Sequence, residues 1–171
     1  THNKSKYKKF KNIKTIIVKK KNFLENLFLF YKIQKKKKFS SILTFNIITD
    51  TLVFVFLKFF FRFRLLCNCQ GDDLAYNKKF FYGARLDFFK NLLFHFVKIF
   101  IDLIIVASSS MFNIAIESGI KKKKLCIIRN GFEFTNFKTA NKTKLRRKYK
   151  IAINKTVFLC ISGHRKIKNI D

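Results

Sequence analysis

Proline is absent from this chain of 171 residues, glycine occurs five times, and nine acidic residues stand against 38 Lys and Arg. The formal net charge of +29 points first to polyanions such as nucleic acid, anionic membranes or phosphorylated molecules. However, only seven of the 38 cations are Arg, the side chain preferred for specific phosphate or base recognition. Because Lys, Phe, Ile and Asn have A/T-rich codons, we attribute much of the charge to a biased genome.

Cysteine and histidine are also too few and too scattered for a metal site. No C-x-x-C pair occurs, and no histidine lies near a cysteine with the spacing of a zinc finger. All four cysteines stand in apolar runs, which is typical of buried thiols in a reducing compartment. Nothing forms a Ser-His-Asp arrangement, so we expect no metal ion and no cofactor. The cysteines are Cys67, Cys69, Cys126 and Cys160.

Long apolar runs are missing as well. The best candidate, residues 42–57, is shorter than the roughly 20 residues of a membrane span and carries Asn46 and Asp50 near its centre. Residues 92–107 are interrupted by three polar side chains. No small-residue cleavage site follows an apolar segment, so a secretory signal is not indicated. We expect a cytoplasmic protein, and peripheral contact with an anionic membrane surface stays open.

The chain lacks the marks of the common nucleic-acid-binding modules. No zinc finger, basic zipper or RNP-type sequence appears, and no repeat occurs at solenoid periods. A surface for single-stranded nucleic acid combines basic residues with exposed aromatic side chains. The phenylalanines here concentrate instead in apolar runs suited to a core. We therefore expect no specific nucleic-acid partner and keep a small basic RNA-binding protein as the alternative function.

Short β-branched runs alternate with longer helix-like stretches along the whole chain. This alternation predicts an α/β fold: a Rossmann-like parallel sheet with helices on both faces and ligands at the carboxyl ends of the strands. The expected strands are 13–18, 41–47, 65–69, 102–107, 125–129 and 156–162. The expected helices are 22–34, 50–60, 85–100, 108–118 and 142–150.

The helix expected at 85–100 has one narrow polar stripe. Asp87, Asn91, His95 and Lys98 follow one another at spacings of four, four and three, and apart from Arg85 and Lys90 the rest of the helix is apolar. A helix of this kind lies mostly buried. We expect His95 to be a structural member of the stripe.

The segment "DLIIVASSSMFNIAIESGIKKKKLCIIRNGFEFTNF" (102–137) resembles the middle of the family 4 glycosyltransferases, which are retaining enzymes of the two-domain GT-B fold. In that family a strand ends in Ser, a helix ends at Gly, and a basic turn follows. The next strand delivers an Asn-Gly with an acid two residues on, and a Phe closes the linker. The matching positions are Ser108, Gly119, Lys121 to Lys124, Asn130, Gly131, Glu133 and Phe137.

The resemblance covers roughly residues 41–171 and implies two domains. Residues 1–130 correspond to the N-terminal acceptor domain, 131–141 to the linker, and 142–171 to the beginning of a truncated C-terminal nucleotide-sugar domain. Asn130 and Gly131 are then the interdomain hinge. A hairpin at this point is disfavoured because no strand follows directly. We expect a fragment of a longer protein that is inactive alone.

In "SGHRKIK", the resemblance implies that Gly163, Arg165 and Lys168 bind the diphosphate of the donor. Backbone N–H groups at a glycine turn and nearby cations stabilise the charge that develops on a departing nucleoside diphosphate. The family usually has its basic residue directly after the glycine, where this chain has His164.

In "CQGDD", Gly71, Asp72 and Asp73 resemble the strand-end turn of the acceptor domain, with Gln70 where the family often has His. The aspartates are expected to bind acceptor hydroxyl groups at the cleft. The implied reaction transfers a sugar from a nucleotide-sugar donor to a glycan or lipid-linked acceptor with retention of configuration. No catalytic residue is assigned, because the family's paired glutamates would follow Asp171.

Overall fold

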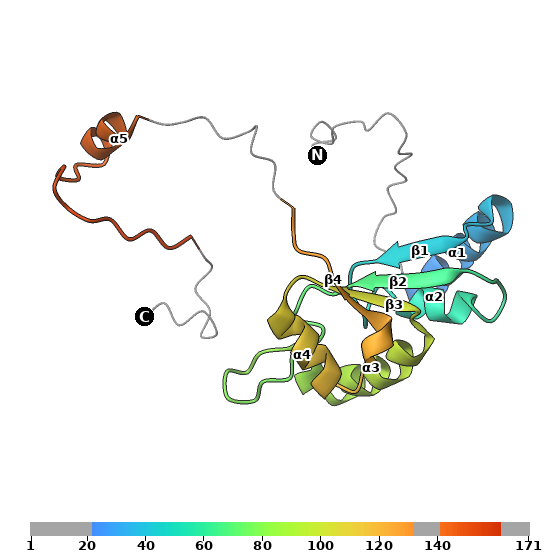
Figure 1. The fold of residues 1–171 in the computed structure, drawn as a ribbon. Coiled ribbons are helices and arrows are strands. Elements are labelled where there is room, and N and C mark those ends of the chain that lie inside the picture. The colour runs from blue at the N-terminus through green and yellow to red at the C-terminus, as the bar shows by residue number, and fades with distance from the viewer. Residues whose placement is uncertain (1–21, 132–140, 162–171) are drawn as a thin grey trace.

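The computed structural model describes residues 22–131 and 141–161 (Figure 1). Four strands form one sheet in the order β1-β2-β3-β4, and every neighbouring pair is parallel. The predicted parallel α/β arrangement is therefore confirmed. The strand expected at 13–18 lies outside the described residues. The strands are β1 (Ser41–Thr44), β2 (Arg64–Asn68), β3 (Leu103–Val106) and β4 (Leu125–Ile127).

All five expected helices are present, and four begin at a side-chain cap. Asn22, Asp87, Ser108 and Asn141 each accept a hydrogen bond from the backbone N–H three residues on. Such caps satisfy N–H groups that have no partner inside the helix. The helices are α1 (Phe23–Lys37), α2 (Leu52–Leu57), α3 (Phe88–Phe100), α4 (Ser109–Glu117) and α5 (Lys142–Lys148), with 3-10 turns η1 (Ala84–Leu86) and η2 (Lys122–Lys124).

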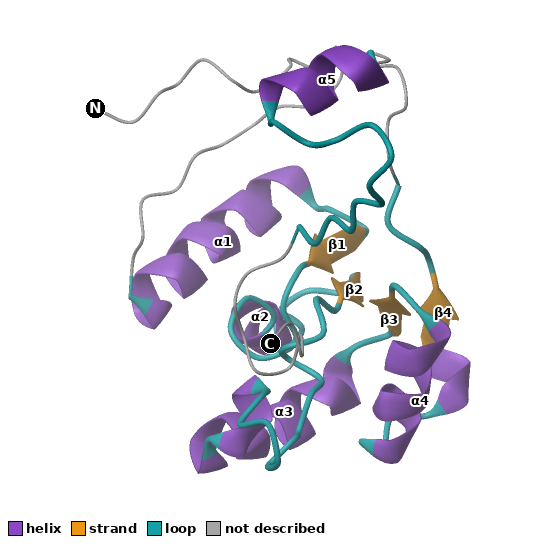
Figure 2. Cartoon of the chain, turned by 90° about the vertical axis from the view of Figure 1, so that its left-hand side faces the viewer, coloured by secondary structure: helices purple, strands orange, loops and turns teal. Residues whose placement is uncertain are grey.

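The three helices that join the strands, α2, α3 and α4, pack on one side of the sheet (Figure 2). The prediction of helices on both faces is wrong for this part of the chain. Its physical reason is the strand order: each strand lies directly beside the previous one, and right-handed crossovers in a constant direction all fall on the same face. A helix on the opposite face would need the strand order to reverse.

Apolar side chains continue onto the opposite face of the sheet. Leu43, Leu66 and Leu103 are lateral neighbours on β1, β2 and β3, and all three are at least partly exposed. Leu43 has 49% of its surface accessible. One face of the sheet is thus the core, and the other is a partly exposed apolar surface.

The core lies between the sheet and its crossover helices. On β2 and β3 every second side chain is fully buried, and on α2 and α3 one or two side chains per turn are. These spacings match the periods of a strand and of a helix. The fully buried side chains are Leu65 and Cys67 from β2, Ile104 and Val106 from β3, Val55 and Leu57 from α2, and Phe94 and Val97 from α3. The helix α1 adds Phe30, whose ring centroid lies 4.9 Å from that of Phe54.

The prediction that the helix at 85–100 is largely buried is wrong. Phe94 and Val97 are its buried residues, whereas Phe88 is 74% and Phe89 73% exposed. The polar stripe explains this orientation, because Asn91 and Lys98 hydrogen bond to Arg85 and to Ser118 respectively. These polar partners hold one side of α3 against the molecule and turn an apolar side outward. We call that side the outer face of α3: Phe88, Phe89, Leu92, Phe96 and Ile99.

Residues 156–161 do not form the expected strand. Phe158 and Ile161 are almost fully exposed there. An apolar segment becomes a central strand when neighbouring strands supply hydrogen bonds and cover its side chains. The described part of 142–161 contains α5 alone as regular structure, and α5 offers neither. The division of the chain into two domains stays a prediction.

Gly83 holds the loop after β2 in a conformation that other residues avoid. Its φ is +116°, and an added Cβ would lie 2.0 Å from the carbonyl oxygen of Ala75. We expect Gly83→Ala to lower the free energy of unfolding by about 3 kcal/mol, because strain and a backbone clash combine. The control is Gly131→Ala, where nothing lies within 4 Å, with an expected change within about 0.5 kcal/mol. Urea unfolding measures both, and equal losses would contradict the assignment.

Candidate functional site

The carboxyl ends of the parallel strands lie along one edge of the sheet (Figure 1). The chain after β1 and the chain after β2 meet there through a single carboxylate. Asp73 is fully buried: its Oδ2 accepts the N–H of Ile47 at 3.0 Å. Its Oδ1 accepts the N–H groups of Gln70 at 3.1 Å and Gly71 at 3.0 Å. Asp73 therefore fixes the positions of two strand-end loops relative to each other.

The two aspartates of the "CQGDD" turn occupy opposite environments. Asp72 is exposed, whereas both oxygens of Asp73 are used by backbone N–H groups. Burial raises the pKa of Asp73, and the N–H groups of Ile47 and Gly71 lower it in part. Of the pair, Asp72 is the carboxylate available to a hydroxyl group from outside.

Gly71 has a φ of +102°, which explains why glycine stands at this turn. A Cβ at this position would lie 3.7 Å from Cε of Met111, in the first turn of α4. The turn after β2 thus lies against the beginning of the helix after β3. Ser108, the strand-end Ser of the resemblance, uses its hydroxyl to cap α4 by accepting from the N–H of Met111.

Two cysteines lie next to the buried carboxylate. Cys67, Cys69 and Asp73 each offer a ligand atom within 4.8 Å of the others, and all three are buried. The contact with Cys67 and burial raise the pKa of the Cys69 thiol, which favours its neutral form. Oγ1 of Thr51 lies 3.7 Å from Sγ of Cys67, within hydrogen-bonding reach of the sulfur. Hydrogen bonding thus accounts for these groups, and we interpret the cluster as structural.

Only some of the remaining predicted site residues lie in the part of the chain that the structure describes. Asn130 and Gly131 are exposed and follow β4, and no antiparallel strand pairs with β4 in the part of the chain that the structure describes. Their role as a hinge stays a prediction. Gly163, Arg165 and Lys168 lie outside the described residues, as do Glu133 and Phe137 of the resemblance.

Sequence reasoning missed Arg85. This side chain is 8% exposed, and the turn η1 that carries it places it between α3 and α4. A faint signal existed, because Arg85 is one of only seven arginines in a chain rich in Lys. The loop from Gly71 to Asp87 therefore contributes the two charged side chains, Asp73 and Arg85, that are buried within residues 22–131 and 141–161.

Models of known protein families give no match to this chain, and a search of curated proteins gives none either. Within 22–131 and 141–161, the structure has no helix long and apolar enough to cross a membrane.

We expect Asp73→Asn to lower the free energy of unfolding by about 2–3 kcal/mol. An amide has one acceptor oxygen in place of two, so at least one buried N–H, of Ile47 or of the Gln70–Gly71 pair, would face an NH₂ group. Asp72→Asn is the matched control, since Asp72 is adjacent and exposed, with an expected change within about 0.5 kcal/mol. Denaturant unfolding followed by circular dichroism compares them. Similar losses in both variants would show that Asp73 does not hold the strand ends.

Proposed function

We propose that this chain is part of a retaining glycosyltransferase of the GT-B type, with residues 1–130 in the acceptor domain and 142–171 at the start of the donor domain. The observation that carries the proposal is the turn after β2. There an exposed Asp72 stands beside Gly71 at the carboxyl edge of a parallel sheet, where α/β proteins bind their ligands. A carboxylate in this position can accept hydrogen bonds from the hydroxyl groups of a glycan or a lipid-linked sugar.

The donor side of the proposal rests on the sequence "SGHRKIK". A nucleotide sugar loses its nucleoside diphosphate as the glycosidic bond forms, and negative charge grows on the leaving group. Gly163 allows the backbone to approach the diphosphate closely, Arg165 offers a forked donor, and Lys168 supplies a point charge. Interactions that strengthen as the charge develops raise the turnover rate.

The test is steady-state kinetics on a protein that carries this chain together with the rest of the donor domain. We expect Arg165→Ala and Lys168→Ala each to cost about 2–4 kcal/mol of transition-state stabilisation, roughly a hundredfold or more in kcat/KM. Lys166→Ala, between the two positions in sequence, is the matched control and should change the rate little. Unchanged kinetics in both variants would place the diphosphate elsewhere. Sugar transfer by the 171-residue chain alone would contradict a two-domain mechanism.

A second observation favours peripheral contact with an anionic membrane. The idea that phenylalanine serves mainly the core is wrong for the described residues, because 13 of the 20 phenylalanines among them are exposed. Five apolar side chains share the outer face of α3, and their positions fall within about 100° around the helix axis. Ring contacts extend this apolar area to the turn that follows α2: Phe96 to Phe100 at 5.1 Å, and Phe100 to Phe59 at 5.7 Å.

The chemistry of this surface fits a lipid interface on the cytoplasmic side. An interfacial helix buries aromatic and aliphatic side chains in the headgroup region while cations attract anionic lipids. The net charge of +29 supplies that attraction. A lipid-linked acceptor would be presented at the same interface.

We expect Phe88→Ser combined with Phe89→Ser to weaken binding to vesicles of phosphatidylcholine and phosphatidylserine by about tenfold or more, because two exposed rings no longer enter the bilayer. Cosedimentation measures it. The matched control combines Phe158→Ser with Leu159→Ser, another adjacent exposed pair, and should bind like the parent chain. Equal losses would indicate general hydrophobic adhesion. Tight binding of single-stranded RNA that the same two rings control would favour the RNA-binding alternative.

A further inference from the structure

Arg85 is a buried cation held entirely by neutral groups. Its Nη1 donates to the carbonyl oxygen of Leu74 at 3.0 Å and to Oγ of Ser118 at 2.6 Å. Its Nε donates to Oδ1 of Asn91 at 3.1 Å. The guanidinium carbon lies 4.3 Å from the ring centroid of Phe94, which gives a cation–π contact.

No carboxylate balances this charge. In the described part of the chain the one ion pair joins Lys58 to Asp102, so Arg85 has no acidic oxygen within 4 Å. Lys98 lies on the same ring, with Nζ 5.4 Å from the centroid of Phe94. Burial lowers the pKa of Arg85, and burial and Arg85 together lower the pKa of Lys98. Two cations therefore share a poorly solvated place, and neither has a carboxylate of the described residues within 4 Å.

One edge of the guanidinium remains available. A guanidinium has five N–H donors, and Nη1 and Nε use three of them, which leaves the two on Nη2. No polar side-chain atom of the described residues is both buried and without a partner, so Nη2 must be reached by solvent.

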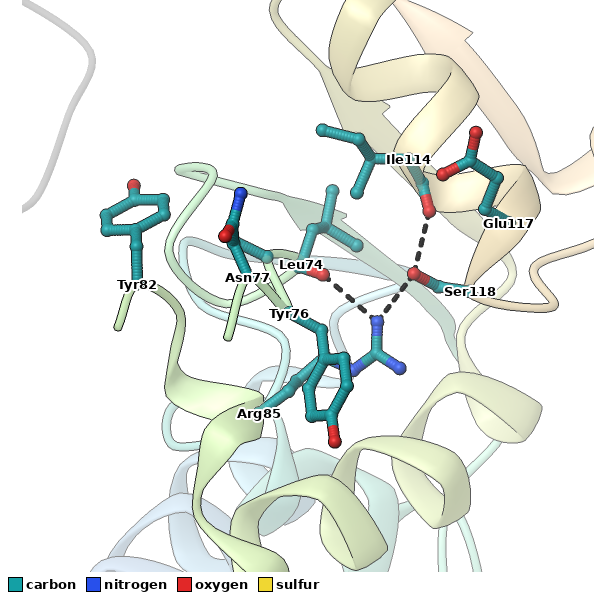
Figure 3. Close-up of a pocket in the computed structure, with 9 residues that line it drawn as sticks. Leu74, Tyr76, Asn77, Tyr82, Arg85, Ile114, Glu117 and Ser118 are labelled. Carbon is teal, nitrogen blue, oxygen red and sulfur yellow. Dashed lines mark hydrogen bonds between the residues drawn. The ribbon is translucent and has the colours of Figure 1, made fainter. Parts of the chain in front are cut away.

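Arg85 lines a cavity of about 400 Å³ between the loop after β2 and α4 (Figure 3). In the close-up the guanidinium lies between Tyr76 and Ser118. Cavities of this volume lie within the range of small-molecule sites. Tyr76, Asn77 and Glu117 add an aromatic ring, an amide and a carboxylate to the lining.

We propose that this cavity binds a small polar molecule through its oxyanion head group, a phosphate or a carboxylate, which pairs with Nη2 of Arg85. A charge-assisted hydrogen bond in a poorly solvated place is stronger than a neutral one. The ligand would bring a negative charge into contact with Arg85, which no carboxylate of the described residues does. The inference stands apart from the proposed sugar transfer, since it needs neither the donor domain nor Asp72.

The rest of the lining restricts the ligand. Glu117 carries a negative charge, so a second anionic group on the ligand would be repelled. Hydroxyl groups suit the amide of Asn77 and the carboxylate of Glu117, and the ring of Tyr76 offers an apolar surface to a sugar or similar frame. A hydroxylated monoacid or a sugar phosphate combines these features.

The experiment is isothermal titration of the chain with inorganic phosphate, glucose 6-phosphate, glucuronate and glucose in about 0.15 M NaCl, which screens the surface lysines. We expect at least one of the three anions to bind and glucose not to bind, and the comparison of phosphate with glucuronate identifies the head group. Arg85→Gln should weaken anion binding about tenfold or more. Glu117→Gln should strengthen it about threefold, because a like charge is removed.

Glu25→Gln on α1 is the control for Glu117→Gln, because it changes the net charge equally and lies outside the cavity. Equal effects of these two substitutions would assign binding to the general charge and overturn the site. Undiminished binding by a folded Arg85→Gln variant would overturn it too, as would the absence of binding of all three anions at millimolar concentration. If circular dichroism shows that Arg85→Gln is unfolded, the comparison of Glu117→Gln with Glu25→Gln by itself tests whether the anion binds in this cavity.

Discussion

Parallel pairing of consecutive strands is the constraint from which the other features of this molecule follow. Each parallel neighbour requires a crossover, and such crossovers are right-handed as a rule. The order β1-β2-β3-β4 never reverses. The helices α2, α3 and α4 therefore share one face (Figure 2). The same pairing gathers the loops after the strands at one edge, where Asp73 joins two of them. The opposite face keeps leucines that are at least partly exposed, Leu43, Leu66 and Leu103.

The loop between β2 and α3 carries two buried charged side chains, and the protein satisfies their hydrogen bonds to different extents. Asp73 receives three backbone N–H groups, so its negative charge is satisfied within the protein and serves the geometry of the edge. Arg85 donates hydrogen bonds only to neutral acceptors, and its Nη2 remains accessible to solvent. A charge whose hydrogen bonds are complete is a structural element, whereas one with free donors beside a cavity is suited to a ligand.

The surface of the molecule is unusually aromatic for its charge. Apolar side chains line the outer face of α3 because its polar residues, Asn91 and Lys98, are required on the inner side by Arg85 and Ser118. A helix cannot turn both its polar stripe and all its apolar residues toward the same neighbours. The polar contacts around one buried arginine thus lead to an exposed apolar face that suits a membrane interface.

The sequence alone determined the order and type of the described elements: the four strands and five helices lie where the apolar periodicity and the cap at Ser108 placed them. These signals are local, since they depend on residues within one or two turns. Only the tertiary structure decided which face the helices cover, that Asp73 and not Asp72 is buried, and that Leu74, Asn91 and Ser118 converge on Arg85. Burial and convergence depend on residues distant in sequence, and no local pattern contains them.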